Sequence, residues 1–126
     1  TIKIWDMKSG LCIITLTGHT GSIYSLALNK DVELISGSYD KKIRIWNILT
    51  GDLLKTLTGH TGYVNSLLIN RRNELISASE DKTIKIWNLE NRQCIRTLLG
   101  HSSGVCSLVL SNDDYLISGS RDTTIK

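Results

Sequence analysis

The sequence predicts an all-β fold, and three observations carry that prediction. His19, His60 and His101 each follow a glycine and lie 41 positions apart, so the chain is built from three similar segments. Each segment contains four short runs in which apolar and polar residues alternate, a pattern typical of strands. Helical spacing of apolar residues does not persist, and the chain has no proline, which suits strands whose backbone N–H groups must donate along a ladder.

The runs predict four strands in each segment, in the following order: 2–5, 11–16, 23–28 and 33–38; then 42–46, 52–57, 63–69 and 74–79; then 83–87, 93–98, 105–110 and 115–120. In the first run of each segment, two isoleucines flank a basic residue and a tryptophan follows. This alternation favours packing of the β-branched side chains on one face of the strand. The turns between runs contain residues that favour tight reversals, as in Ser9-Gly10, Asn29-Lys30-Asp31 and Asn112-Asp113-Asp114.

Further positions keep the same period as the histidines. Tryptophan recurs at Trp5, Trp46 and Trp87, and aspartate recurs at Asp40, Asp81 and Asp122. A Gly-His opening and a Trp-Asp-like close at a period of about 40–45 residues are typical of propeller blades. The chain resembles the WD-repeat (WD40) family from end to end, with asparagine replacing the aspartate of the Trp-Asp pair in two copies. The resemblance implies β-propeller blades of four antiparallel strands.

The resemblance also implies that the outermost strand of each blade belongs to the next sequence repeat. With repeat units at about 1–41, 42–82 and 83–123, we expect complete blades at about 22–57 and 63–98 and partial blades at 1–16 and 104–126. Closed propellers have about 4–8 blades, so we expect an incomplete ring. The last three residues repeat the first three. The chain is therefore expected to be a fragment of a larger propeller or a protomer of a homo-oligomer that completes the ring, with two copies giving about six blades.

Composition limits the function classes. The net charge of +3 is spread through the repeats and does not form one basic cluster, so a nucleic-acid partner is disfavoured. Apolar runs are too short for a membrane span. The three cysteines are odd in number and lack C-x-x-C spacing, which predicts free thiols, an intracellular and cytoplasmic location, and no metal site. No phosphate-binding glycine motif is present, and no cofactor is expected.

A serine recurs between each histidine and its aspartate, and Ser-His-Asp resembles a nucleophile triad. The same set appears once per repeat, whereas an enzyme needs one activated nucleophile, so no catalytic residue is expected. The resemblance implies a structural relay from Trp to Ser to His to Asp. Its residues are His19, Ser36, Asp40 and Trp46; His60, Ser77, Asp81 and Trp87; and His101, Ser118 and Asp122. Ser38, Ser79 and Ser120 share the same strand face and are alternative relay serines.

Binding is expected where the copies differ. The family resemblance implies a top face formed by the start of each inner strand and the residue before the turn aspartate. These positions are Ser22, Tyr24, Tyr39, Tyr63, Asn65, Glu80 and Arg121, with Gly104 and Cys106 at equivalent places. The expected function is a non-catalytic scaffold that binds a protein or peptide there. The alternatives are a regulatory repeat region of a larger multidomain protein, a nucleic-acid-binding propeller, or tyrosines that only cap the inner strands.

Overall fold

The computed structural model describes residues 1–30 and 32–126. Asp31, which the sequence places in a turn, lies outside the described residues. The strands are β1 (Ile2–Trp5), β2 (Cys12–Leu16), β3 (Ile23–Asn29), β4 (Glu33–Ser38), β5 (Ile43–Asn47), β6 (Leu53–Leu57), β7 (Val64–Ile69), β8 (Glu74–Ser79), β9 (Ile84–Asn88), β10 (Gln93–Leu98), β11 (Val105–Leu110) and β12 (Leu116–Ser120). The predicted all-β class is confirmed, and the described part of the chain contains no helix, hence none that could cross a membrane.

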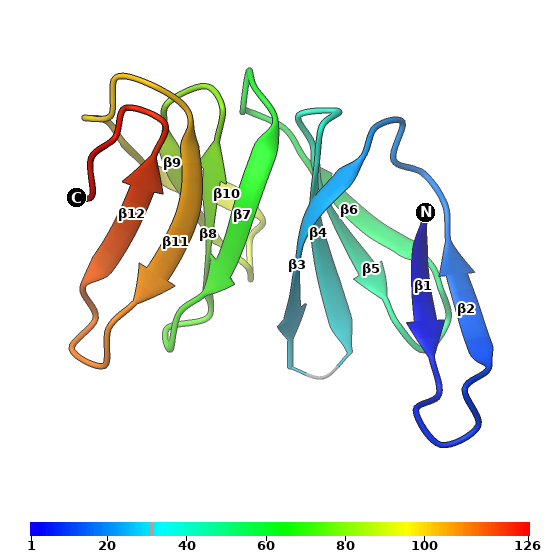
Figure 1. The fold of residues 1–126 in the computed structure, drawn as a ribbon. Helices are drawn as coiled ribbons and strands as arrows, with labels where there is room; N and C mark the ends of the chain where they lie inside the picture. The colour runs from blue at the N-terminus through cyan, green and yellow to red at the C-terminus, as the bar shows by residue number, and fades with distance from the viewer. Residues whose placement is uncertain (31) are drawn as a thin grey trace.

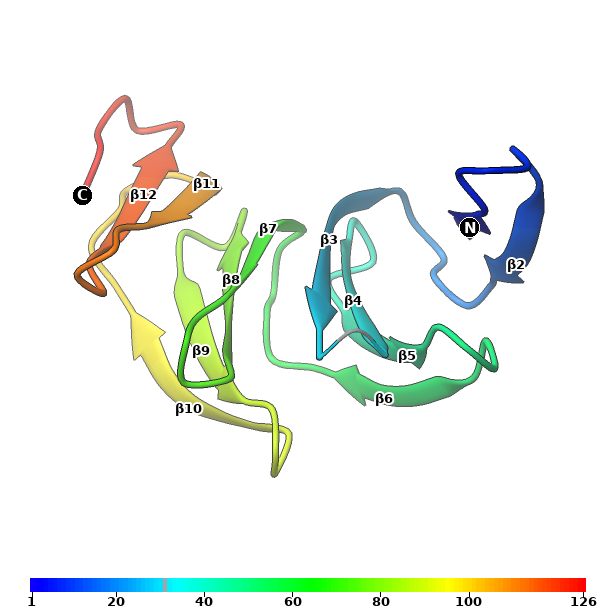
Figure 2. The same cartoon turned by 90° about the horizontal axis from the view of Figure 1, so that it is seen from below.

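The strands form two four-stranded antiparallel sheets, β3-β4-β5-β6 and β7-β8-β9-β10, and two hairpins, β1-β2 and β11-β12 (Figure 1). Strand β3 lies beside β7, and β7 lies beside β11, so the first strands of successive sheets face one another (Figure 2). Strands β6 and β10 form the opposite, outer edge. The sheets stand side by side as propeller blades, and the described residues do not close into a ring.

The hydrophobic core consists of three layers, each lying between two neighbouring blades. Trp46 packs against Ile2 and Leu16 between the β1-β2 hairpin and the first full sheet. The second layer joins the two full sheets and contains Ile43 and Trp87 among its buried members. The third layer lies between the second full sheet and the β11-β12 hairpin. Each blade therefore depends on its neighbour for burial, as expected for repeats that cannot bury their own faces.

Gly37 lies where the two full sheets approach closely. A Cβ atom added at Gly37 in β4 would lie 2.6 Å from Cγ1 of Val64 in β7. The equivalent position in the second sheet is Ala78, and in the third it is Gly119, where an added Cβ would have its nearest neighbour at 3.9 Å. The neighbour at Gly119 is Ser107 of the same hairpin, so an added methyl there meets no other blade among the described residues.

The two hairpins differ in the pairing of their second edges. Strand β1 pairs only with β2 among the described residues, and Trp5 at its end is 53 % exposed. Strand β12 pairs with β11, and its other side pairs with residues 124–126 around the bridge between Gly119 and Ile125. The backbone hydrogen bonds there run from Ser118 N–H to Lys126 O at 2.8 Å, from Lys126 N–H to Ser118 O at 3.0 Å and from Ser120 N–H to Thr124 O at 3.3 Å. Ile125 is 77 % exposed, whereas the equivalent Ile43 and Ile84 are buried. Among the described residues, the second edge of β1 has no partner strand, whereas residues 124–126 cover the second edge of β12.

Candidate functional site

The repeated Trp, Ser, His and Asp side chains meet within each full sheet. In the second sheet, Nε1 of Trp87 donates to Oγ of Ser77 at 2.9 Å, and Nε2 of His60 lies 2.8 Å from the same oxygen. Nδ1 of His60 lies 2.7 Å from Oδ2 of Asp81. The first sheet repeats these contacts at 2.9, 2.7 and 2.8 Å, among Trp46, Ser36, His19 and Asp40.

The chemistry of the groups assigns the protons of this relay. An ionised carboxylate only accepts, so Nδ1 of His60 carries the proton that it donates to Asp81. Burial lowers the pKa of His60, which favours the neutral ring, so Nε2 accepts from the Ser77 hydroxyl. Burial alone would raise the pKa of Asp81, but hydrogen bonds from Thr83, His60 and the Thr61 backbone lower it to about 2. The network is thus a neutral histidine held by an ionised aspartate.

Each aspartate also holds the turn that follows it and the loop that carries the histidine. Oδ2 of Asp81 accepts from the backbone N–H of Thr61 at 2.9 Å, and Oδ1 accepts from the N–H of Thr83 at 3.0 Å. The same pair of backbone contacts occurs at Asp40 and Asp122. The relay therefore fastens two loops at one end of the blade to strands in its interior.

The other serines on the strand face do not contact the histidines. Oγ of Ser38 accepts from the N–H of Asp40 at 3.1 Å and donates to the carbonyl of Gly21 at 3.3 Å. Ser79 and Ser120 likewise accept from the N–H groups of the aspartates two residues later. Of the two serine sets, the histidines thus contact Ser36, Ser77 and Ser118.

The relay serines are not placed to attack a substrate. Ser36 and Ser77 are 0 % exposed, and each hydroxyl lies between an indole N–H and a histidine. A nucleophile must reach a bound substrate, so this burial argues against the triad interpretation. Among the described residues, no group of three or more histidine, cysteine or acidic side chains is arranged to hold a metal ion.

The first relay contains an arginine that the sequence analysis did not include. Nη1 of Arg44 donates to Oδ2 of Asp40 at 2.7 Å and lies 2.5 Å from Nδ1 of His19. In the second blade, Thr83 supplies a hydroxyl to Asp81 at 2.7 Å, but its counterpart in the first blade is Lys42. The lysine at position 42 is the difference in the sequence that could have indicated this contact. Because Lys42 has no hydroxyl to donate to Asp40, the Arg44 guanidinium donates to that carboxylate instead.

The third set is incomplete in this structure. His101 contacts Asp122 at 2.8 Å and Ser118 at 2.9 Å, as in the other blades. Within residues 1–30 and 32–126, Ser118 accepts from no indole and Trp5 donates to no serine.

Three of the predicted binding residues form one aromatic cluster, which we call the tyrosine patch: Tyr24, Tyr39 and Tyr63. Tyr39 and Tyr63 are stacked with ring centroids 3.9 Å apart and planes 18° apart, and Tyr63 Oη donates to Tyr39 Oη at 3.0 Å. Tyr24 meets Tyr39 edge-on at 6.4 Å. Tyr24 and Tyr39 are 51 % and 46 % exposed, and Ser22 beside them is also exposed.

The remaining predicted residues lie on the next two blades. Nη1 of Arg121 contacts Oε1 of Glu80 at 3.2 Å, and Asn65 donates to the carbonyl of Val105 at 3.0 Å. These contacts join the second full sheet to the β11-β12 hairpin. Asn65 is half-buried, so its amide links blades as well as facing the surface.

Gly104 and Cys106, which the repeat places at the third copy of the predicted binding face, differ in accessibility. Gly104 is buried under Glu80, and an added Cβ would collide with that carboxylate, so Gly104 cannot present a side chain to a partner. Cys106 is exposed, as are Cys12 and Cys94, and all three thiols are free.

Stacked four-stranded antiparallel sheets, each tied by the same four side chains, define a protein of β-propeller blades. The family model described as "WD domain, G-beta repeat" matches residues 10–47, 51–88 and 92–126. The chain belongs to the WD-repeat family. A comparison with curated proteins found no match. Repeats of this family are generally protein-interaction scaffolds and are typically non-catalytic.

Proposed function

We propose that this chain is a non-catalytic scaffold that binds a protein or peptide partner through the tyrosine patch and the residues around it. The single observation that carries the proposal is the exposed stack of Tyr39 on Tyr63, with Tyr24 against its edge. The patch spans two blades, because Tyr24 lies in β3 and Tyr39 follows β4 of the first full sheet, and Tyr63 precedes β7 of the second.

The patch has the properties of an interaction hot spot. Tyrosine combines a large rigid ring with a hydroxyl, and such residues contribute disproportionately to binding energy. The mutual hydrogen bond with Tyr39 raises the pKa of Tyr63, so its hydroxyl stays protonated at neutral pH. The rings are already stacked, which reduces the side-chain entropy that a partner would have to overcome.

Surrounding groups add polar recognition. Ser22 is exposed beside the tyrosines, and Glu80 and Arg121 form a partly exposed ion pair on the following blades. An extended peptide crossing the blade ends would meet aromatic rings first and then a carboxylate and a guanidinium. Such a charged rim favours specificity and association rate more than raw affinity.

The test is a selection of ligands followed by matched substitutions. A library of displayed random peptides is selected on the wild-type chain without any selection against the variants. Fluorescence anisotropy of a selected peptide should show at least a 10-fold weaker Kd for each single variant, as a 1.4 kcal/mol loss gives. Tyr115→Ala is the matched control, because Tyr115 is 71 % exposed and precedes β12 at the opposite end of the blades.

Circular dichroism spectra should coincide for all of these proteins, because the replaced side chains are exposed or half-buried. If peptides selected on the wild-type chain bind both single variants with unchanged Kd, the tyrosine patch is not the binding site. The intracellular, cytoplasmic location expected from the free thiols remains part of the proposal and is tested by imaging the tagged chain in cells.

A further inference from the structure

A cleft of about 320 Å³ opens between the two full sheets, where β6 faces the turn from β9 to β10 on the outer side of the arc (Figure 2). We call it the junction cleft. Of the described residues that line it, two are cations and none is acidic. Its polar side chains are Lys55, Thr58, Arg92, Gln93 and Cys94. The β9-β10 turn is one strand length away from the turn that carries Asp81, so the cleft is separate from the tyrosine patch.

The same junction one repeat earlier is apolar. There Ile14 stands in place of Lys55, and Gly51 stands in place of Arg92. A Cβ atom added at Gly51 would lie 3.3 Å from Cγ2 of Ile14 and 3.6 Å from Cδ2 of Leu16, so the glycine packs directly against aliphatic side chains. The junction cleft therefore has two cations at the positions where the earlier junction has an apolar contact.

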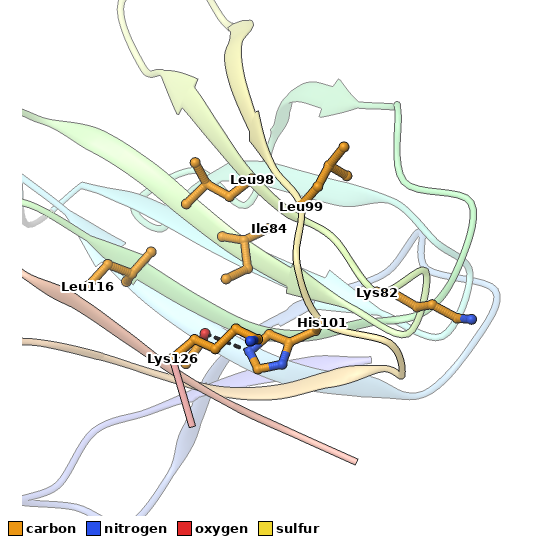
Figure 3. Close-up of a pocket in the computed structure, with 8 residues that line it drawn as sticks. Lys82, Ile84, Leu98, Leu99, His101, Leu116 and Lys126 are labelled. Carbon is orange, nitrogen blue, oxygen red and sulfur yellow. Dashed lines mark hydrogen bonds between the residues drawn. The ribbon is translucent and has the colours of Figure 1, made fainter. Parts of the chain in front are cut away.

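The cavity at the next junction also differs from the junction cleft. It has a volume of about 200 Å³ and lies between the second full sheet and the β11-β12 hairpin. Ile84, Leu98 and Leu116 meet across it, and the Lys82 side chain extends away from them (Figure 3). Its walls are thus largely aliphatic, whereas those of the junction cleft carry cations, an amide and a hydroxyl.

Arg92 has a backbone conformation that favours glycine. Its φ is 62°, and the equivalent Gly10 and Gly51 have φ values of 72° and 82°. A residue with a Cβ atom adopts this conformation at a cost. The arginine side chain offsets part of that cost through an ion pair with Glu33 of the preceding blade, in which Nη2 lies 2.5 Å from Oε1 and Nη1 lies 3.4 Å from Oε2. This pair fixes the orientation of the guanidinium between the two sheets.

The polar side chains of the junction cleft have donors that the protein does not use. A guanidinium has five N–H donors, and Glu33 takes two of those of Arg92. Within residues 1–30 and 32–126, the side chains of Lys55, Thr58 and Gln93 make no hydrogen bond or ion pair. Because Glu33 compensates the charge of Arg92, Lys55 supplies the net positive charge of the cleft.

We propose that the junction cleft binds a phosphate group, with Lys55 Nζ and the free N–H groups of Arg92 donating to its oxygens and Gln93 and Thr58 as further donors. An oriented arginine fork gives geometric selectivity for phosphate oxygens, and a lysine acts on them as a point charge. A phosphate group carries a charge of about −1.5 to −2 at neutral pH and three acceptor oxygens, which suits several donors around one cleft. The group is either free phosphate or a phosphorylated side chain of a partner.

Cys94 reports on the junction cleft, and Cys12 is its matched reference. Cys94 lines the cleft and its Sγ lies 3.5 Å from the carbonyl of Arg96, while Cys12 occupies the equivalent position two repeats earlier with Sγ 3.6 Å from the carbonyl of Ile14. Both thiols are free and exposed. Their rates of alkylation by anionic iodoacetate and by neutral iodoacetamide are measured on the whole chain by peptide mass mapping.

The ratio of the iodoacetate rate to the iodoacetamide rate measures the local potential, because both reagents attack the thiolate and the ratio cancels differences in thiol pKa. This ratio should be at least about twofold greater at Cys94 than at Cys12, as one unit charge within several ångströms in water gives. Lys55→Gln should lower the ratio at Cys94 to that at Cys12, and Lys55→Arg should preserve it. Equal ratios at the two thiols of the wild-type chain overturn the proposal.

Protection of Cys94 tests binding itself. Inorganic phosphate at about 10 mM should slow the iodoacetamide reaction of Cys94 at least about twofold relative to chloride at the same ionic strength, and it should leave Cys12 unchanged. Lys55→Gln should abolish the protection. Lys8→Gln, which removes an exposed lysine of the first hairpin, should retain it. Tyr39→Ala should also retain it, so failure of the tyrosine patch as a binding site leaves this result unaffected.

A blocked phosphoserine tripeptide and its unphosphorylated form identify the source of the group. Protection by the phosphorylated peptide at lower concentration than inorganic phosphate supports a phosphorylated partner, and protection by inorganic phosphate alone supports the free ion. The proposal is overturned if neither protects Cys94, if the unphosphorylated peptide or acetate protects as well as phosphate does, or if Lys55→Gln is protected like the wild-type chain.

Discussion

Replacing Ser77 by alanine tests whether the repeated Ser-His-Asp set is structural. The hydroxyl accepts from Trp87 Nε1 at 2.9 Å and lies 2.8 Å from His60 Nε2. Both partners are nearly inaccessible, with Trp87 3 % and His60 7 % exposed, so neither regains a water partner when the oxygen is removed. Each buried unsatisfied group costs about 1–3 kcal/mol, and we expect Ser77→Ala to lower the free energy of unfolding by about 2–4 kcal/mol.

Urea unfolding followed by circular dichroism measures this loss, with the slope of free energy against urea serving as a check that the variants unfold alike. Ser66→Ala is the matched control in the neighbouring strand. The Ser66 side chain is half-buried and makes no hydrogen bond with the described residues, so its loss should stay within about 0.5 kcal/mol. A double-mutant cycle with Trp87→Phe should show coupling of at least about 0.5 kcal/mol, because the phenyl ring has no N–H to leave unpaired. The structural relay would be refuted if Ser77→Ala lowered the free energy of unfolding no more than Ser66→Ala does and showed no coupling energy with Trp87→Phe.

Three further predictions follow from the same contacts. Gly37→Ala should destabilise the fold by about 1–3 kcal/mol because the added methyl meets Val64, whereas Gly119→Ala should be close to neutral; thermal unfolding measures both. The Asp81 pKa of about 2 lies below its ordinary 3.8, so the unfolded chain binds more protons in acid. Asp81 should therefore contribute about 2 kcal/mol that is present above pH ~4 and lost toward pH 2, as acid titration of Asp81→Asn against wild type would show. Arg44→Gln should raise the His19 pKa in an NMR titration, because burial and then the arginine charge lower it and glutamine removes that charge, and it should leave the His60 pKa unchanged.

The periodicity of the chain predicts most of the fold because each repeat has the same apolar faces, which must be buried against neighbouring blades. Trp46 and Trp87 have similar surroundings in sequence and occupy similar cores in the structure. The resemblance to the WD-repeat family implies the relay residue by residue, and the hydrogen-bonding types of Trp, Ser, His and Asp are compatible with it. The choice between Ser36 and Ser38 could not be predicted, because both side chains project from the same face of β4 and only the three-dimensional path of the histidine loop distinguishes them.

The contacts between blades were the part that the sequence did not predict. The stack of Tyr39 on Tyr63 joins residues of two repeats at non-equivalent positions, so no comparison of aligned copies reveals it. The burial of Gly104 depends on the Glu80 carboxylate reaching across from the preceding blade. The role of Arg44 depends on Lys42, which stands where the other two repeats have a threonine. That difference is visible in the sequence, but only the side-chain geometry shows that Arg44 donates to Asp40 in place of the threonine.

The proposed scaffold function is tested most directly by mapping a selected peptide onto the chain through backbone amide chemical shifts. The account predicts that the largest perturbations on titration fall at Tyr24, Tyr39 and Tyr63 and in the turns beside them, with the amide of Tyr115 unaffected. Perturbations concentrated at the Tyr115 end of the blades, with the tyrosine patch unchanged, would contradict it.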